Sequence, residues 1–212
     1  MFGVIFDMDG TLLDTQSVYI PAWNYAGEKQ GFKNCGEHVK YVLGTNEEIW
    51  TKYLVDTFAG LDVPLFKREA TRYIKETLNI KFKKGAEELL AYLRKRGIKY
   101  AIGSGSNTEV IEKYLELLGA GDGFEYIVGG DQVENSKPAP DTFLLAAKKM
   151  GIPPENCFVF EDSDNGALAA HNAGMKCIGI PDVVDFSDET KARLHAELKN
   201  LAEAIEIFEN IN

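Results

Sequence analysis

The residues best suited to chemistry are two aspartates, Asp7 and Asp9, which follow a short apolar run at residues 3–6. A run of this length predicts one buried strand. In an open α/β sheet, ligands bind beyond the carboxyl ends of the strands, so we expect both carboxylates to face a polar cleft. Side chains alternate along an extended chain, so the two acids would point the same way and could share a metal ion or a proton.

A loop of small residues offers a second group for the same cleft. Ser104 and Gly105 lie in the segment 103–107, between a predicted strand and a predicted helix. A hydroxyl and exposed backbone N–H groups at such a place can bind phosphate oxygens. Serine and asparagine also cap helices, which is the alternative interpretation of this segment.

Two later segments add a cation and more acids. Lys137 precedes a loop stiffened by Pro138 and Pro140, and a cation held on a stiff loop loses little ordering entropy when it binds an anion. Glu161 and Asp162 end another predicted strand, where hard oxygen ligands suit Mg²⁺.

The elements that must position these side chains follow a repeating β–α pattern. Besides residues 3–6, short apolar runs predict buried parallel strands at residues 100–102, 126–128, 158–160 and 177–180. Segments of helical spacing that end at glycine predict helices at residues 86–95, 110–118, 143–150 and 167–173. This order predicts an α/β fold with a doubly wound parallel sheet. The tail, residues 189–208, is predicted to be a loosely amphipathic helix.

Residues 16–80 differ from this pattern, because aromatic and apolar residues recur there at helical spacing and no strand is indicated. The segment starts directly after the acidic loop. We therefore predict a core of residues 1–15 and 81–212, with an inserted α-helical cap of residues 16–80. The cap would lie over the cleft and exclude water from it.

Composition argues against several classes of partner. A formal net charge of −10 disfavours a broad nucleic-acid or anionic-membrane surface. The three cysteines, Cys35, Cys157 and Cys177, are too widely spaced to indicate a disulfide framework or a zinc site. No apolar run approaches the roughly 20 residues that span a bilayer, and the first strand leaves no space for a signal segment. We expect a cytoplasmic monomer that binds a small molecule.

Jointly, these motifs are more specific than any one of them: an acidic pair, a serine, a lysine followed by proline, and a second acidic pair on successive loops. In this pattern the sequence resembles the haloacid dehalogenase superfamily, within it the phosphatase and β-phosphoglucomutase-like branch with a helical cap. The resemblance rests on residues 6–15, Ser104, residues 137–141 and residues 159–174. It implies a Mg²⁺-dependent phosphotransferase with a covalent aspartyl-phosphate intermediate.

The resemblance also implies a role for each group. Asp7 would attack phosphorus, and Asp9 would protonate the leaving oxygen and then deprotonate water. The groups that hold the transferring oxygens would be Ser104, Gly105 and Lys137. The Mg²⁺ ligands would be the Asp7 carboxylate, the Asp9 carbonyl, Glu161 and Asp162. The ionised acids carry about −4 and the two cations about +3, so a protonated Asp9 would balance the site, because crowded carboxylates raise one another's pKa.

Five further residues are candidates at the cap or its hinge: Thr11, Asp14, Tyr19, Glu47 and Asn107. Thr11 would position the acidic loop and Asp14 would hold the hinge; the alternative is that each is a simple turn or helix-cap residue.

The choice between a phosphatase and a sugar-phosphate mutase depends on two of these positions. Relatives with mutase activity carry an arginine a few residues after a cap glycine, where this chain has Glu47 and Glu48. They also carry a histidine on the first cap helix, where this chain has Tyr19. Both departures favour a phosphatase acting on a small phosphorylated metabolite such as a sugar phosphate. A β-phosphoglucomutase-type mutase is the alternative, and a phospho-accepting receiver domain is the alternative outside enzymes.

Overall fold

The structure is a computed structural model that describes residues 2–77 and 80–211, and within these ranges six strands form one parallel sheet. The order of the strands is β3-β2-β1-β4-β5-β6, which places the first strand inside the sheet. The strands are β1 (Gly3–Phe6), β2 (Tyr100–Gly103), β3 (Tyr126–Val128), β4 (Cys157–Glu161), β5 (Lys176–Gly179) and β6 (Ala196–Glu197). The predicted doubly wound α/β sheet is confirmed.

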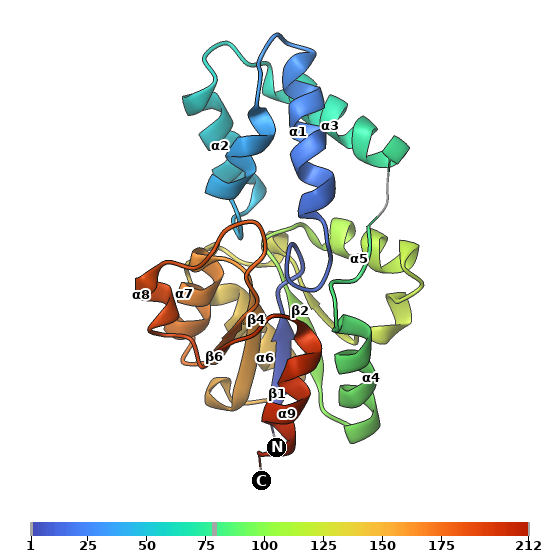
Figure 1. Cartoon of the computed structure of the whole chain (residues 1–212), viewed down its shortest axis with the longest axis vertical. Coiled ribbons are helices and arrows are strands. Elements are labelled where there is room, and N and C mark those ends of the chain that lie inside the picture. The colour runs from blue at the N-terminus through green and yellow to red at the C-terminus, as the bar shows by residue number, and fades with distance from the viewer. Residues whose placement is uncertain (1, 78–79, 212) are drawn as a thin grey trace.

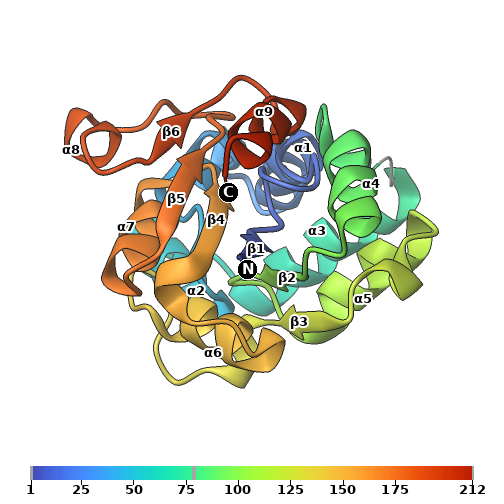
Figure 2. The same ribbon diagram turned by 90° about the horizontal axis from the view of Figure 1, so that it is seen from below.

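Helices cover both faces of this sheet, as Figure 2 shows from below. One face packs against α4 (Ala86–Arg96), α5 (Thr108–Leu117) and α9 (Ala204–Glu209), and the other against α6 (Asp141–Met150) and α7 (Asp164–Asn172). In β1, Val4 and Phe6 belong to the first hydrophobic cluster and Ile5 to the second, and all three side chains are fully buried. A strand buried on both faces needs a continuous apolar sequence, which β1 has.

The register of the sheet brings the ends of three strands to one level. Phe6 pairs with Ile102 of β2 on one side and with Phe160 of β4 on the other. The residues that follow these pairs therefore emerge at the same edge of the sheet, as expected for parallel strands.

A separate group of helices lies over that edge (Figure 1). These cap helices are α1 (Gln16–Glu28), η1 (Cys35–Tyr41), α2 (Glu47–Thr57) and α3 (Val63–Thr77). They bury a hydrophobic cluster of their own, which includes Trp23, Leu54 and Phe66. The segment that leads into the cap helices and the segment that leads back to the sheet lie side by side, because the Asp14 N–H donates to the Lys81 carbonyl at 2.9 Å.

The predicted helices occur at the expected places along the chain, but three of them start earlier than the sequence pattern indicated. The helices predicted to begin at residues 110, 143 and 167 begin at Thr108, Asp141 and Asp164. Polar first turns explain the difference, because they carry no apolar periodicity. The short 3-10 turns η2 (Gly121–Gly123), η3 (Gly130–Gln132) and η4 (Pro154–Asn156) complete this part of the chain. None of the helices in the described ranges is long and apolar enough to cross a membrane.

The prediction for the tail was wrong, because residues 189–208 are not one helix. They contain the end of α8 (Asp188–Lys191), strand β6, η5 (Leu201–Glu203) and most of α9. The His195 N–H donates to the Cys177 carbonyl at 2.7 Å, and the Leu198 N–H donates to the Gly179 carbonyl at 2.9 Å. Pairing with the open edge of β5 thus outweighs the weak helical preference of a polar segment.

Candidate active site

The carboxylate of Asp7 and the ammonium group of Lys137 form a buried ion pair directly beyond β1. Asp7 Oδ1 lies 2.5 Å from Lys137 Nζ, and the same nitrogen lies 2.7 Å from Glu161 Oε1. The three side chains are almost completely buried. The Asp7 N–H donates to the Phe160 carbonyl at 2.9 Å, so the backbone of β4 orients the residue. A buried lysine is tolerated here because it is paired with two acids.

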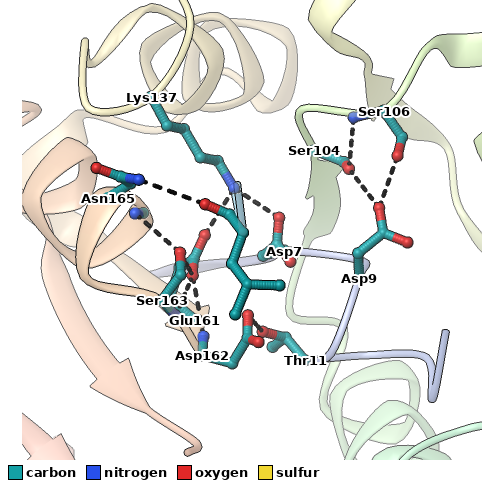
Figure 3. A network of polar contacts seen from close by, with 12 residues as sticks. Asp7, Asp9, Thr11, Ser104, Ser106, Lys137, Glu161, Asp162, Ser163 and Asn165 are labelled. Carbon is teal, nitrogen blue, oxygen red and sulfur yellow. Dashed lines mark hydrogen bonds and ion pairs between the residues drawn. The ribbon is translucent and has the colours of Figure 1, made fainter. Parts of the chain in front are cut away.

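Glu161 holds this lysine in place through contacts on both of its oxygens. Its Oε2 accepts hydrogen bonds of 2.9 Å from the backbone N–H groups of Asp162 and Ser163 and from the Ser163 hydroxyl. A Cβ at Gly166 would lie 1.7 Å from Oε1, so only glycine lets α7 start this close to the carboxylate. Figure 3 shows Glu161 between Lys137 and the start of α7.

Three acids gather where a metal ion could bind. Asp7, Glu161 and Asp162 each offer one oxygen, and these oxygens all lie within 4.8 Å of one another. Asp162 is oriented by two donors, the Thr11 hydroxyl at 3.1 Å and the Gln16 side-chain amide at 2.7 Å. Clustered carboxylate oxygens are the ligands that hard divalent cations prefer. The side chain of Asp9 is not part of this cluster, and the ligand role of its carbonyl stays a prediction.

Burial raises the pKa of two of these acids. Burial raises the pKa of Asp7 to about 8, against the lowering effect of Lys137. Burial, with the charges of Glu161 and Asp7, also raises the pKa of Asp162 well above its ordinary value. Although burial lowers the pKa of Lys137, its two carboxylate partners raise it, so the lysine stays charged. The residues fit a divalent cation, because its charge would relieve the repulsion among the acids.

Asp9 lies on the opposite side of the site and has two differently placed oxygens. Its Oδ2 accepts hydrogen bonds from the Ser106 hydroxyl at 2.6 Å and the Ser104 hydroxyl at 3.4 Å. Its Oδ1 is buried and has no hydrogen-bond partner among the described residues. Burial raises the pKa of Asp9, and the nearby hydroxyls of Ser106, Thr15 and Tyr19 lower it in part. Figure 3 shows Asp9 facing both serines.

The serine loop, residues 103–107, is organised by its own hydrogen bonds. The Ser106 N–H donates to the Ser104 hydroxyl oxygen at 3.0 Å, and Ser104 is fully buried. Asn107 occupies the N-cap position of α5, but its side chain makes no capping bond. Its Nδ2 instead lies 3.5 Å from Glu47 Oε2 on the cap helices. The capping alternative therefore does not describe this asparagine.

The other predicted cap and hinge residues lie at three different contacts. Thr11 supports Asp162, and Asp14 lies where the chain leaves the sheet toward α1. The Tyr19 hydroxyl on α1 lies 3.3 Å from the Tyr114 hydroxyl on α5. Burial and the nearby Asp9 carboxylate raise the pKa of Tyr19 well above its ordinary value. Tyr19 thus places a polar group of the cap beside Asp9.

Sequence reasoning missed three polar residues of this region: Gln16, Lys67 and Ser106. Ser106 could have been found, because it is a second hydroxyl in the serine loop. Gln16 and Lys67 carry no motif, and only the docking of the cap helices brings them to the site.

A cavity of about 340 Å³ lies between the cap helices and the edge of the sheet. Asp7, Asp9 and Ser104 to Asn107 line it from the core. Trp23, Trp50 and Phe66 are among the residues that line it from the cap. This volume is within the range of small-molecule sites.

Comparison with known protein families and sequences identifies the family of this chain. The family model described as haloacid dehalogenase-like hydrolase matches residues 4–180. The chain belongs to the haloacid dehalogenase-like hydrolase family. It is 34% identical to fructose-1-phosphate phosphatase YqaB of Escherichia coli over 84% of this chain and 95% of that protein. It is 31% identical to phosphorylated carbohydrates phosphatase of Thermotoga maritima over 98% of this chain and 97% of that protein.

Solved structures of this family have the same architecture. The crystal structure of CbbY from Rhodobacter sphaeroides, in complex with phosphate, matches with a TM-score of 0.82 and 27% identity. The match covers 96% of each chain. Membership of this family, together with relatives that are phosphatases, identifies the protein as a hydrolase of phosphoric monoesters.

Proposed function

We propose that this family member is a Mg²⁺-dependent phosphatase that hydrolyses a small phosphorylated metabolite of the sugar-phosphate type through an aspartyl-phosphate on Asp7. The observation that carries the proposal is the buried Asp7–Lys137 pair beside a cavity that both Asp7 and Asp9 line. Two relatives named as phosphatases of fructose 1-phosphate and of phosphorylated carbohydrates support the substrate class. The core of residues 1–15 and 81–212 and the cap of residues 16–80 are part of this proposal.

Each step of the proposed reaction has a group of the chain to perform it. An Asp7 carboxylate oxygen attacks phosphorus, and the bond from phosphorus to the leaving oxygen breaks. Asp9 gives its proton to that oxygen, and Oδ1 is the oxygen that carries it, because Oδ2 already accepts from two serine hydroxyls. Asp9 then takes a proton from the water that hydrolyses the aspartyl-phosphate.

Positive charge and hydrogen-bond donors compensate the charge of the transferring group. Lys137, the Ser104 hydroxyl and the serine-loop N–H groups bind its oxygens. Asp7, the Asp9 carbonyl, Glu161 and Asp162 would hold Mg²⁺, which supplies charge neutralisation when bound. The cap helices exclude water that would compete for the phosphoryl group.

The substitution Asp7→Asn tests the nucleophile. We expect it to lower kcat for p-nitrophenyl phosphate by at least about 10³-fold, because a neutral amide is a poor nucleophile and cannot form the acyl phosphate that a carboxylate forms. The circular dichroism spectrum should stay that of the wild type. Asp56→Asn, at an exposed position of α2, is the control. A variant with near-normal turnover would contradict the assignment.

Metal binding can be measured without turnover. Millimolar Mg²⁺ should raise the melting temperature of the wild-type protein, because a ligand that binds only the folded state stabilises it. Asp162→Asn should lose most of this increase, while Asp164→Asn, two residues along the chain, should keep it. An equal increase in all three proteins would argue against the predicted ligand set.

A substrate panel distinguishes the phosphatase from the mutase alternative. β-Glucose 1-phosphate with a trace of the 1,6-bisphosphate should release inorganic phosphate. Glucose 6-phosphate formed without release of phosphate would instead support the mutase. A stably phosphorylated protein without turnover would support the receiver-like alternative.

A further inference from the structure

The cap side of the cavity carries an ion pair that the sequence motifs do not include. Lys67 Nζ on α3 lies 2.7 Å from Glu47 Oε1 at the start of α2. The same nitrogen lies 4.7 Å from the centre of the Trp50 ring, which fixes the lysine from a second side. Asn107 of the serine loop donates to Glu47 Oε2 at 3.5 Å. Both oxygens of this carboxylate are therefore in contact, one with the cap and one with the core.

The pair determines the charge of the cap side of the cavity. Among the described residues that line it, Lys67 is the only cation and Glu47 the only acid that the cap helices contribute. The remaining cap lining is mostly aromatic and aliphatic. The two side chains stay accessible, with exposed fractions of 32% for Lys67 and 50% for Glu47, so a ligand in the cavity can contact both.

We propose that Glu47 neutralises Lys67 toward the cavity, so that the site accepts phosphomonoesters with an uncharged, hydroxyl-bearing leaving group and rejects those with a second anionic group. This inference rests on the phosphatase function proposed above and names the part of the chain that chooses its substrate.

The hydrogen-bonding chemistry of the pair suits hydroxyl groups. A carboxylate accepts a hydrogen bond from one hydroxyl, and an ammonium group donates to the oxygen of a neighbouring one. The aromatic and aliphatic side chains of the cap lining offer an apolar surface for the carbon skeleton of the same ligand. A polyol therefore finds an acceptor, a donor and an apolar surface within one small area.

A second phosphate finds no such match. It would need an unpaired cation, and the Lys67 ammonium already contacts a carboxylate that would repel the incoming anion at close range. Removing the charge of Glu47 would leave Lys67 free to bind an anion, which makes the glutamate the residue that sets the selectivity.

The experiment compares Glu47→Gln with the wild type on fructose 1-phosphate and fructose 1,6-bisphosphate, measured as kcat/KM from released phosphate. We expect the ratio of bisphosphate to monophosphate to rise at least tenfold in this variant. Glu48→Gln is the matched control, because Glu48 is the next residue of the same exposed turn and does not line the cavity. Its ratio should equal that of the wild type.

A double variant shows whether the gain passes through the lysine. Glu47→Gln with Lys67→Met should lose the increased use of the bisphosphate, since the freed cation is gone. An unchanged ratio in Glu47→Gln, or the same increase in the double variant, would overturn the inference. Wild-type protein that hydrolyses p-nitrophenyl phosphate but neither sugar phosphate would also overturn it. Wild-type protein that hydrolyses none of the three would overturn the proposed function itself.

Discussion

Lys137 is the residue that holds the charged side chains of this site together, because it forms ion pairs with both Asp7 and Glu161. Its ammonium group lies within 2.7 Å of Glu161 and closer to Asp7, and no part of its side chain reaches solvent. It serves the fold as well as the proposed chemistry, because it compensates buried negative charge.

Replacing this lysine should therefore cost stability. We expect Lys137→Met to lower the free energy of unfolding by about 3 kcal/mol in the metal-free protein, because it leaves two buried carboxylates without a cationic partner. Urea denaturation at pH 7 measures the effect. Lys148→Met, at an exposed position of α6, should change the same quantity by less than about 0.5 kcal/mol. Equal midpoints and slopes for the two variants would contradict this account.

The sequence indicated which acids and which lysine come together, because residues that directly follow parallel strands must emerge at the same edge of the sheet. It could not indicate how single atoms are used. The free Oδ1 of Asp9 and the bonds on Oδ2 follow from the conformation of the serine loop. Contacts between distant segments, such as that of Gln16 with Asp162, have no local pattern to reveal them.

Secondary-structure elements position the serine loop through a contact between α5 and η3. Asp131 of η3 accepts hydrogen bonds from the Thr108 N–H at 2.7 Å and from the Thr108 hydroxyl at 2.8 Å. Partial burial raises the pKa of Asp131, but these bonds lower it more, and the result is a pKa below the ordinary value. The first turn of α5, directly after the serine loop, thus depends on an ionised carboxylate.

This contact predicts a stability difference that changes with pH. Asp131→Ala should lower the free energy of unfolding by about 1 kcal/mol at pH 7, as loss of a helix cap does. Since the pKa is lowered in the folded state, the contribution is complete above the unfolded pKa of about 3.9 and disappears as pH falls through the folded value. Urea denaturation at pH 7 and at about pH 3 checks this. For Asp185→Ala, at an exposed position, the difference in free energy of unfolding from the wild type should be the same at both pH values.

Strands were predicted well from the sequence and the tail poorly, for one physical reason. An apolar run such as β1 is buried on both faces and has no alternative environment. In the tail, apolar residues alternate irregularly with charged ones, so its structure depends on the open edge of β5, where Ala196 and Glu197 pair with Ile178 and Gly179. The position of that edge is set by the assembly of the whole sheet, so the local sequence pattern does not predict it.

The whole molecule brings the cap helices and the core together around one cavity, and the contact between cap and core is close. Asn165 Nδ2 at the start of α7 donates to the Leu43 carbonyl of the cap at 3.4 Å. On the other side, a Cβ at Gly105 would lie 2.7 Å from the Thr45 carbonyl oxygen. The segment 43–46 is therefore held between α7 and the serine loop.

Gly105→Ala should displace the cap, because its methyl group would lie only 2.7 Å from the Thr45 carbonyl oxygen. We expect at least a tenfold loss in kcat/KM together with a larger radius of gyration by small-angle X-ray scattering. The control is Gly121→Ala, whose Cβ would have its nearest neighbour at 4.0 Å. An active variant with unchanged scattering would show that the serine loop tolerates the methyl group.

The separate hydrophobic cluster of the cap has a practical consequence for retargeting the protein. The hydrogen-bond and ion-pair partners of Asp7 and Asp9 come from the core, whereas Trp50, Lys67 and Thr71 line the cavity from cap helices with their own interior. A combinatorial library at these three positions can therefore explore new leaving groups while the reacting groups keep their supports.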